Sequence, residues 1–186
     1  MTISSKKMVF IAMYTAIICV TGFIAIPVGP IPIVLQNVLA LMAAGLLGLV
    51  HGIISVALFL LLGALGLPVF SGGNGGLAVL QGPTGGFLWG YLLGTIVLGL
   101  IVAKPKIDEK SFAWKNILRM VVASIVGMIV LYIPGIIHFM VLTESSFAKT
   151  MAVCVTPFIL FDFIKLCIII PLVLKLRPSL GRFIEK

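Results

Sequence analysis

The chain has 186 residues, of which 61% are apolar and only 10% are charged. About 25% of the residues of an average soluble domain are charged, so this composition excludes an ordinary water-soluble fold and indicates a protein whose solvent is the lipid bilayer. A net charge of +8 would suggest nucleic-acid binding in a soluble chain. Here the basic residues lie in the tails and in one loop, where they act as topology signals, so no nucleic-acid partner is expected.

Apolar runs of about 20 residues, each long enough to cross a bilayer, recur along the chain. They predict an all-α integral membrane protein with six transmembrane helices, over about 8–26, 33–50, 53–70, 83–103, 117–140 and 151–174. Three prolines between 27 and 32 end the first helix, and the fifth is expected to be interrupted near Pro134. These spans use almost all of the sequence, so residues 1–186 are predicted to form a single membrane domain.

The basic residues test this number of helices. If the N-terminus, with Lys6 and Lys7, is cytoplasmic, six crossings place the basic segment 104–115 and the basic tail 175–186 in the cytoplasm too. The outer loops are then 27–32, 71–82 and 141–150, and they contain a single lysine, Lys149. This asymmetry follows the positive-inside rule and predicts that both termini are cytoplasmic.

One pair of opposite charges, Asp162 and Lys165, lies inside the last apolar run. A charge at membrane depth costs at least about 3 kcal/mol, and residues three apart share one face of a helix, so the two side chains are expected to pair. The pair has two interpretations. It either locks helices together or forms the polar floor of a binding cavity, in which Asp162 accepts hydrogen bonds from ligand N–H groups and Lys165 meets an acceptor or an anion.

A glycine-rich segment, Gly72 to Gly76, surrounds Asn74 in the second outer loop. Glycine allows positive φ angles and close approach to a ligand, so Gly73, Asn74 and Gly75 are candidate binding residues; the alternative is a flexible outer loop. No Gly-Lys-Ser/Thr ending follows, so the loop is not expected to bind nucleotide phosphates.

Two glutamines add polar groups on the same outer side. Gln81 follows the glycine-rich segment, and Gln36 lies just inside the second helix, where an amide needs a partner in lipid. Both are candidate binding residues.

Small residues recur at helical spacing in two places. Gly82, Gly86, Gly90 and Gly94 form a stripe on the fourth helix, which favours close packing against a neighbouring helix. Ala12 and Ala16 lie one turn apart on the first helix and indicate either internal packing or a docking strip for another membrane protein.

Three segments in their order along the chain resemble signatures of the BioY family. They are Ile-Pro-Val-Gly-Pro-Ile-Pro-Ile-Val-Leu-Gln at 26–36, the long block at 62–87 that contains Ser-Gly-Gly-Asn-Gly-Gly, and the Asp-x-x-Lys of Asp162 and Lys165. Proteins of this family are substrate-binding S components of energy-coupling-factor (ECF) transporters. The resemblance therefore implies high-affinity biotin binding near the outer face and biotin uptake across the bacterial plasma membrane.

The resemblance also assigns roles and partners. It implies that Asn74, Asp162 and Lys165 contact biotin, that the glycine-rich loop closes over it, and that Ala12 and Ala16 dock a transmembrane coupling (T) component. Two ABC ATPases would supply the energy. The chain itself is then not an enzyme and has no cofactor, with biotin as its transported ligand.

Three other functions stay open from the residues. The chain is an S component for a different vitamin, a membrane enzyme acting on a lipid or isoprenoid, or a purely structural membrane protein. An enzyme of that kind needs a cluster of metal-binding acids or a nucleophile with its base, and the sequence has one acid inside its apolar spans.

Overall fold

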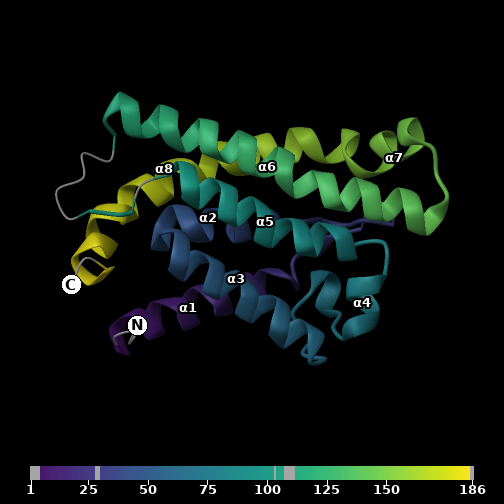
Figure 1. Cartoon of the computed structure of the whole chain (residues 1–186), viewed down its shortest axis with the longest axis horizontal. Helices are drawn as coiled ribbons and strands as arrows, with labels where there is room; N and C mark the ends of the chain where they lie inside the picture. The colour runs from purple at the N-terminus through teal and green to yellow at the C-terminus, as the bar shows by residue number, and fades with distance from the viewer. Residues whose placement is uncertain (1–4, 28–29, 103, 107–111, 185–186) are drawn as a thin grey trace.

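The computed structural model describes residues 5–27, 30–102, 104–106 and 112–184, and it is almost entirely helical (Figure 1). Within these ranges six helices have twelve or more residues: α1 (Ser5–Thr21), α2 (Gln36–Leu47), α3 (Leu49–Ala64), α5 (Gly85–Ile101), α6 (Trp114–Thr143) and α8 (Thr156–Ile184). The shorter elements are β1 (Ala25–Ile26), β2 (Ile33–Val34), the 3₁₀ turn η1 (Ser71–Gly73), α4 (Leu77–Gln81) and α7 (Phe147–Cys154). The long helices correspond to the six predicted spans.

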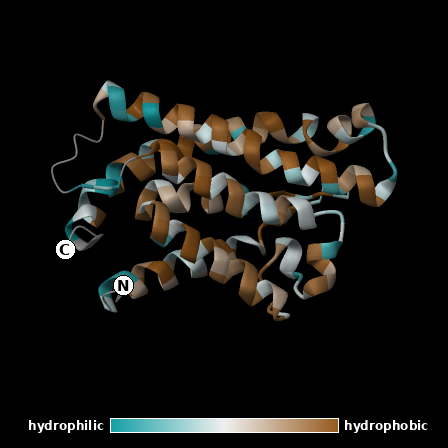
Figure 2. Cartoon of the chain, viewed as in Figure 1, coloured by the Kyte–Doolittle hydropathy of each residue, from teal (hydrophilic) through white to brown (hydrophobic). Residues whose placement is uncertain are grey.

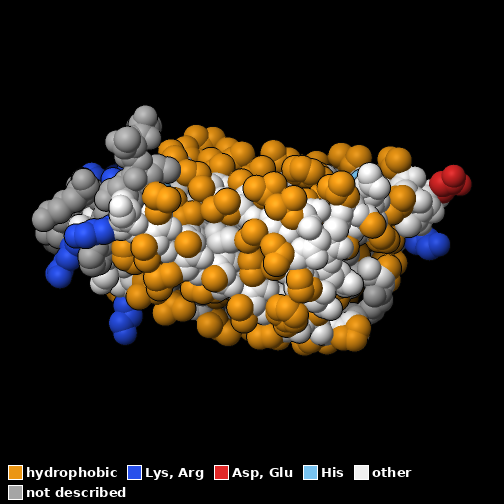
Figure 3. All heavy atoms as spheres, turned by 90° about the horizontal axis from the view of Figure 1, so that it is seen from below, with side chains coloured by type: hydrophobic (Ala, Val, Ile, Leu, Met, Phe, Trp, Pro, Cys, Tyr) orange, Lys and Arg blue, Asp and Glu red, His pale blue; other side chains and the backbone are white. Residues whose placement is uncertain are grey.

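The helices lie side by side along the long axis of the molecule, and both ends of the chain emerge at the same end (Figure 1). Most of the Lys and Arg side chains in view gather at that end, and the face shown in Figure 3 is covered mainly with apolar side chains. Hydrophobic residues also follow the helices along their length (Figure 2). This distribution agrees with the predicted cytoplasmic position of the basic segments. Lys110 and Lys186, which belong to those segments, lie outside the described residues.

The predicted boundaries of the first three helices are wrong at their outer ends. The first helix ends at Thr21 rather than Ile26, and the second begins at Gln36 rather than Ile33. The residues that were assigned to these helix ends pair instead as an antiparallel hairpin, with Ala25 opposite Val34. The third helix ends at Ala64 because Gly66, with φ +99°, reverses the chain two residues later.

α2 is therefore short. Twelve residues span about 18 Å at ~1.5 Å per residue, so α2 begins well below the outer face of a core that is about 30 Å thick. By length and apolar composition alone, α6 and the run from Phe147 to Arg182 qualify as membrane spans, and the other long helices are shorter. The late start of α2 places its N-terminal turn inside the protein, beneath the β1–β2 hairpin.

Two helices near the C-terminus also differ from prediction. α6 continues through Pro134 without the expected interruption, as membrane helices do where neighbouring groups answer the freed carbonyl. The predicted sixth helix is divided at Val155 into α7 and α8, and α8 continues far beyond Leu174. Arg177, which we expected in a cytoplasmic tail, is 1% exposed and donates a hydrogen bond to the carbonyl of Gly45.

The predicted glycine stripe is a packing surface between α5 and α6. A Cβ added to Gly90 would overlap the carbonyl oxygen of Leu131, and one added to Gly94 would lie 2.7 Å from the carbonyl oxygen of Gly127. Gly86 meets Pro134 in the same way, so the backbones of the two helices touch directly. Gly82 precedes α5 and is not part of this contact.

We predict that Gly90→Val separates α5 from α6 and destabilises the protein by about 1–3 kcal/mol, because overpacking a filled interface costs that much. The measurement is the midpoint temperature of unfolding in detergent, which is monitored as the loss of the monodisperse peak in size-exclusion chromatography after heating. Leu93→Val, on the exposed face of α5, is the matched control. Equal midpoints for the two variants would contradict close backbone packing.

Candidate functional site

The two membrane charges form an ion pair, as the sequence predicts. Lys165 Nζ lies 2.8 Å from Asp162 Oδ1, and both residues are on the face of α8 that packs against the rest of the protein. Asp162 is only 3% exposed. A buried pair of this kind is stable only where the remaining lone pairs of the carboxylate and the remaining N–H groups of the ammonium form further hydrogen bonds.

Asn37, in the first turn of α2, supplies two of these hydrogen bonds. Its amide nitrogen donates to Asp162 Oδ1 at 2.9 Å, and its amide oxygen accepts from Lys165 Nζ at 3.2 Å. One amide therefore bridges both charges.

Tyr132 and Val34 complete the network. The Tyr132 hydroxyl, on α6, donates to Asp162 Oδ2 at 2.6 Å, and Lys165 Nζ donates to the carbonyl of Val34, in β2, at 2.7 Å. All three N–H donors of the ammonium are now used. On the carboxylate, Oδ1 accepts two hydrogen bonds and Oδ2 accepts one, so Oδ2 keeps a position for one further donor.

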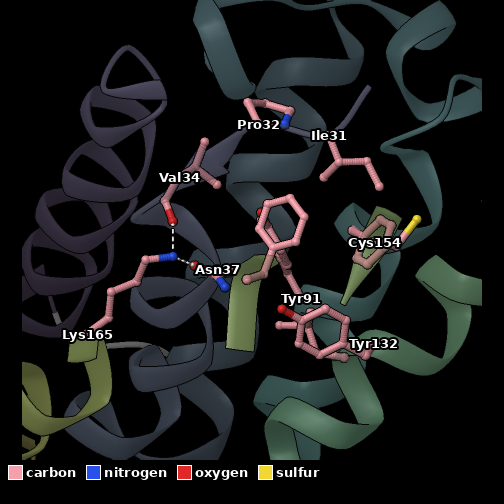
Figure 4. A pocket seen from close by; sticks show the side chains of 11 residues that line it. Ile31, Pro32, Val34, Asn37, Tyr91, Tyr132, Cys154 and Lys165 are labelled. Carbon is pink, nitrogen blue, oxygen red and sulfur yellow. Dashed lines mark hydrogen bonds between the residues drawn. The ribbon is translucent and has the colours of Figure 1, made fainter. Parts of the chain in front are cut away.

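The network borders a small cavity of about 40 Å³ beneath the hairpin (Figure 4). In the figure, Lys165 and Asn37 approach from one side, Tyr91 and Tyr132 from the other, and Ile31 and Pro32 lie above. The remaining walls are apolar or aromatic and are formed by Val34, Phe87, Leu131, Cys154 and Phe158. A polar cluster on one wall and aromatic rings on the others are typical of a small-molecule site.

A second cavity, of about 30 Å³, adjoins the first on the outer side. The two share five residues of the hairpin and α5, namely Ile31, Pro32, Val34, Phe87 and Tyr91. The second cavity adds Ser71 and Thr84, and the buried hydroxyl of Ser71 has no hydrogen-bond partner among the described residues. The hairpin is thus the shared roof of two small chambers.

The predicted binding residue Gln36 has a different position from its neighbour Asn37. It is fully buried, and its amide nitrogen donates to the carbonyls of Ile18 at 2.9 Å and Val69 at 2.7 Å. These bonds tie α2 to the end of α1 and to the segment before η1. Gln36 lines neither of the two cavities.

The glycine-rich loop lies next to the site without lining it. Asn74 is exposed and its amide donates to the carbonyl of Ser71 at 2.7 Å. Gly73 has φ +74° and faces the ring of Phe23, and Gly75 packs against the backbone of Leu67. Of this loop, Ser71 reaches the second cavity.

Gln81 ends α4 and its side chain is exposed. Its carbonyl, together with that of Gly82, faces His138 Nε2. Of the predicted binding residues, the structure therefore brings together Asp162 and Lys165. Gln36, Gln81 and the glycine-rich segment lie near this pair but do not contact it.

Sequence reasoning missed the residues that complete the network. The only sequence feature that could have identified Asn37 as a site residue is its position as a polar residue just after the proline-rich segment. For Tyr132 the sequence left two positions open, at a membrane interface or in the wall of a pocket, and it did not single out Tyr91. The packing of α5 and α6 places both rings beside the cavity.

The predicted docking residues Ala12 and Ala16 lie on the outward face of α1. Both are exposed, with Met13 and Ile17 beside them. The internal-packing interpretation therefore does not hold for these two alanines. Their side is a flat apolar strip open to a partner or to lipid.

We predict that Lys165→Met lowers the free energy of unfolding by about 3–5 kcal/mol, because it leaves the Asp162 carboxylate buried without its cation. The double variant Asp162→Asn/Lys165→Met removes both charges and should recover most of that loss. Thermal midpoints of the wild type, both single variants and the double variant give the coupling energy directly. A fully stable Lys165→Met protein would show that the pair does not stabilise the fold.

A sequence profile of the BioY family matches residues 1–182. The chain is similar to the biotin transporter BioY of Thermotoga maritima, with 37% identity over 92% of this chain and 96% of that protein. It is also similar to the biotin transporter BioY of Lactococcus lactis subsp. cremoris, with 36% identity over 95% and 93% of the two chains. These relatives are transporters, which confirms the prediction that the chain is not an enzyme.

A solved structure agrees with this result. The fold matches the crystal structure of the S-component for biotin from an ECF-type ABC transporter, with a TM-score of 0.83 and 32% identity over 95% of each chain. The predicted all-α, integral membrane fold and its place in the plasma membrane are confirmed. The chain belongs to the BioY family.

Proposed function

We propose that this chain is the substrate-capturing S component of an ECF-type ABC transporter and that it binds biotin for uptake. The observation that carries the proposal is the hydrogen-bonded network of Asp162, Lys165, Asn37 and Tyr132, of which the last three line the small cavity beneath the hairpin. The comparisons support it through relatives that are biotin transporters. Residues 1–186 act in this proposal as one membrane domain.

The chemistry of the site suits biotin. The ureido ring of biotin carries two N–H donors and one carbonyl acceptor, and its remaining carbon skeleton is apolar except for a terminal carboxylate. In the proposal, Asp162 Oδ2, which has room for one further donor, accepts one ureido N–H once the cavity has widened as far as the carboxylate, which does not line it in this structure. The Asn37 amide, which lines the cavity, gives up a bond to the ion pair and forms one with the ring instead. Phe87, Tyr91 and Phe158 give the apolar walls that the ring system needs.

The hairpin must move when biotin binds. Pockets that hold drug-sized ligands enclose about 300–1,000 Å³, whereas the two cavities hold about 40 and 30 Å³. Lifting Ile31 and Pro32 joins them into one chamber, because both residues line both cavities. The same movement withdraws the Val34 carbonyl from Lys165, so the ammonium gains a free donor for a ligand carbonyl or carboxylate.

The remaining predicted residues have supporting roles in this proposal. Asn74, Gly73 and Gly75 form part of the outer cover and contact the ligand when the hairpin and the loop close together. Gln36 and Gln81 hold the frame of the site, Gln36 through its two carbonyl partners and Gln81 through the contact of its carbonyl with His138. 

The partners in the proposal are a transmembrane coupling component and two ABC ATPases, with the coupling component bound at Ala12 and Ala16. The exposed position of both alanines supports this contact, since small residues let two helices approach closely in a membrane. The energy of transport comes from the ATPases, and the chain itself needs no cofactor.

We predict that the double variant Asp162→Asn/Lys165→Met folds but binds biotin at least about 100-fold more weakly, which corresponds to about 2.8 kcal/mol. Removing both charges avoids the unpaired charge of a single variant, so loss of binding is separated from loss of fold. Isothermal titration of detergent-purified protein measures the dissociation constant. Glu144→Gln/Lys149→Met, which also removes one acid and one lysine and lies outside the cavities, is the charge-matched control and should bind as the wild type does.

An unchanged affinity in the folded double variant would remove the ion pair from the binding site. The alternative function, an S component for a different vitamin, is tested in the same instrument with thiamine and riboflavin. Tight binding of either of these, with no heat from biotin, would replace the proposed ligand and leave the site in place.

We predict that Ala12→Leu/Ala16→Leu reduces co-purification with the coupling component and its ATPases at least about tenfold, because the larger side chains separate the two helices. Biotin affinity of the isolated variant should not change, since neither alanine lines the cavities. Ala152→Leu, on the exposed side of α7, is the control. Full recovery of the complex would place the coupling component elsewhere.

A further inference from the structure

A deep groove runs between α6 and α8 on the outside of the bundle. α6 packs along α5, while α8 packs mainly on α2, so the two helices separate from each other over the middle of their length. The groove encloses about 410 Å³, far more than either cavity beneath the hairpin. Its lining is apolar apart from two residues and comprises Ile125, Met128, Ile129, Tyr132, Ile133, Ile136, Met151, Val155, Ile159, Asp162, Phe163 and Leu166.

The walls of the groove face the bilayer. Ile129, Ile133 and Ile159 are about half exposed or more in the isolated chain, and in an integral membrane protein such a surface meets lipid chains. Water is excluded from this region of the bilayer, and an empty volume of this size would forfeit the packing energy of every atom around it. The medium that surrounds the groove therefore fills it.

The length of the groove fits one leaflet. From Ile125 to Ile136 the α6 wall extends about 16 Å at ~1.5 Å per residue, and half of a hydrocarbon core of about 30 Å is about 15 Å. Its upper end lies near Met151 on α7, about two turns before the outer end of α6 at Thr143. The α6 wall begins about three turns after Trp114 and ends about two turns before Thr143, so the groove lies around the middle of this helix, where lipid acyl chains surround the protein.

The floor of the groove reaches the binding network. Tyr132 and Asp162 line the groove, and Tyr132 also lines the cavity beneath the hairpin. The Tyr132–Asp162 hydrogen bond thus forms a thin partition between the polar site and the membrane. We infer that one acyl chain of a bilayer lipid occupies the α6–α8 groove and completes the lateral wall of the site. This inference rests on the membrane setting and is independent of the identity of the transported ligand.

The test is photolabelling of the full chain in phosphatidylcholine vesicles that contain phosphatidylcholine with a mid-chain diazirine. Met128 lines the groove but is only 8% exposed, so lipid on a flat helix surface does not reach it. We expect Met128 to be modified at least as often as the exposed Leu93 on α5, and Met120, which is 1% exposed and does not line the groove, to stay unmodified. Tandem mass spectrometry assigns the modified residue.

Two matched variants test the groove itself. Ile133→Trp places an indole across the groove and should lower the modified fraction at Met128 about tenfold, equivalent to about 1.4 kcal/mol. Ile137→Trp is on the same helix and exposed to lipid but does not line the groove, and it should leave Met128 labelling unchanged. An unmodified Met128 beside a modified Leu93 overturns the inference.

Discussion

Two opposite charges are stable inside a membrane only if each donor and acceptor position on both groups forms a hydrogen bond, either within the protein or with a ligand. In this chain Asp162 and Lys165 meet that condition through one another, the Asn37 amide, the Tyr132 hydroxyl and the Val34 carbonyl. These groups come from α8, α2, α6 and β2. The arrangement of the whole bundle around this point follows from the need to bring four separate segments to one ion pair.

The short α2 is the structural feature that makes the network possible. A helix that crossed the whole bilayer would carry Asn37 near the outer surface. Because the β1–β2 hairpin replaces the outer turns of α2, the first turn of α2 begins at the depth of Asp162, where the Asn37 side chain donates to the carboxylate. The hairpin then lies directly above the network and holds it closed through Val34. The element that shortens the helix is also the one that has to move for a ligand to enter.

The sequence predicted the parts of this structure that depend on composition and on local spacing. Long apolar runs gave six spans, positively charged segments gave their orientation, and the separation of three residues paired Asp162 with Lys165. The hairpin was missed because Ile33 and Val34 extend an apolar run, and only pairing with Ala25 and Ile26 identifies them as a strand. Asn37, Tyr132 and the burial of Arg177 were missed because each depends on contacts between helices far apart in sequence.

The most direct measurement is the position of bound biotin in a structure of this chain determined with the ligand. We expect a ureido nitrogen of biotin to lie about 2.7–3.2 Å from Asp162 Oδ2, which is a hydrogen-bonding distance, and the Val34 carbonyl to be displaced from Lys165. Biotin bound elsewhere, with Asp162, Lys165, Asn37 and Val34 still bonded to one another, would make the network a purely structural lock and contradict the account.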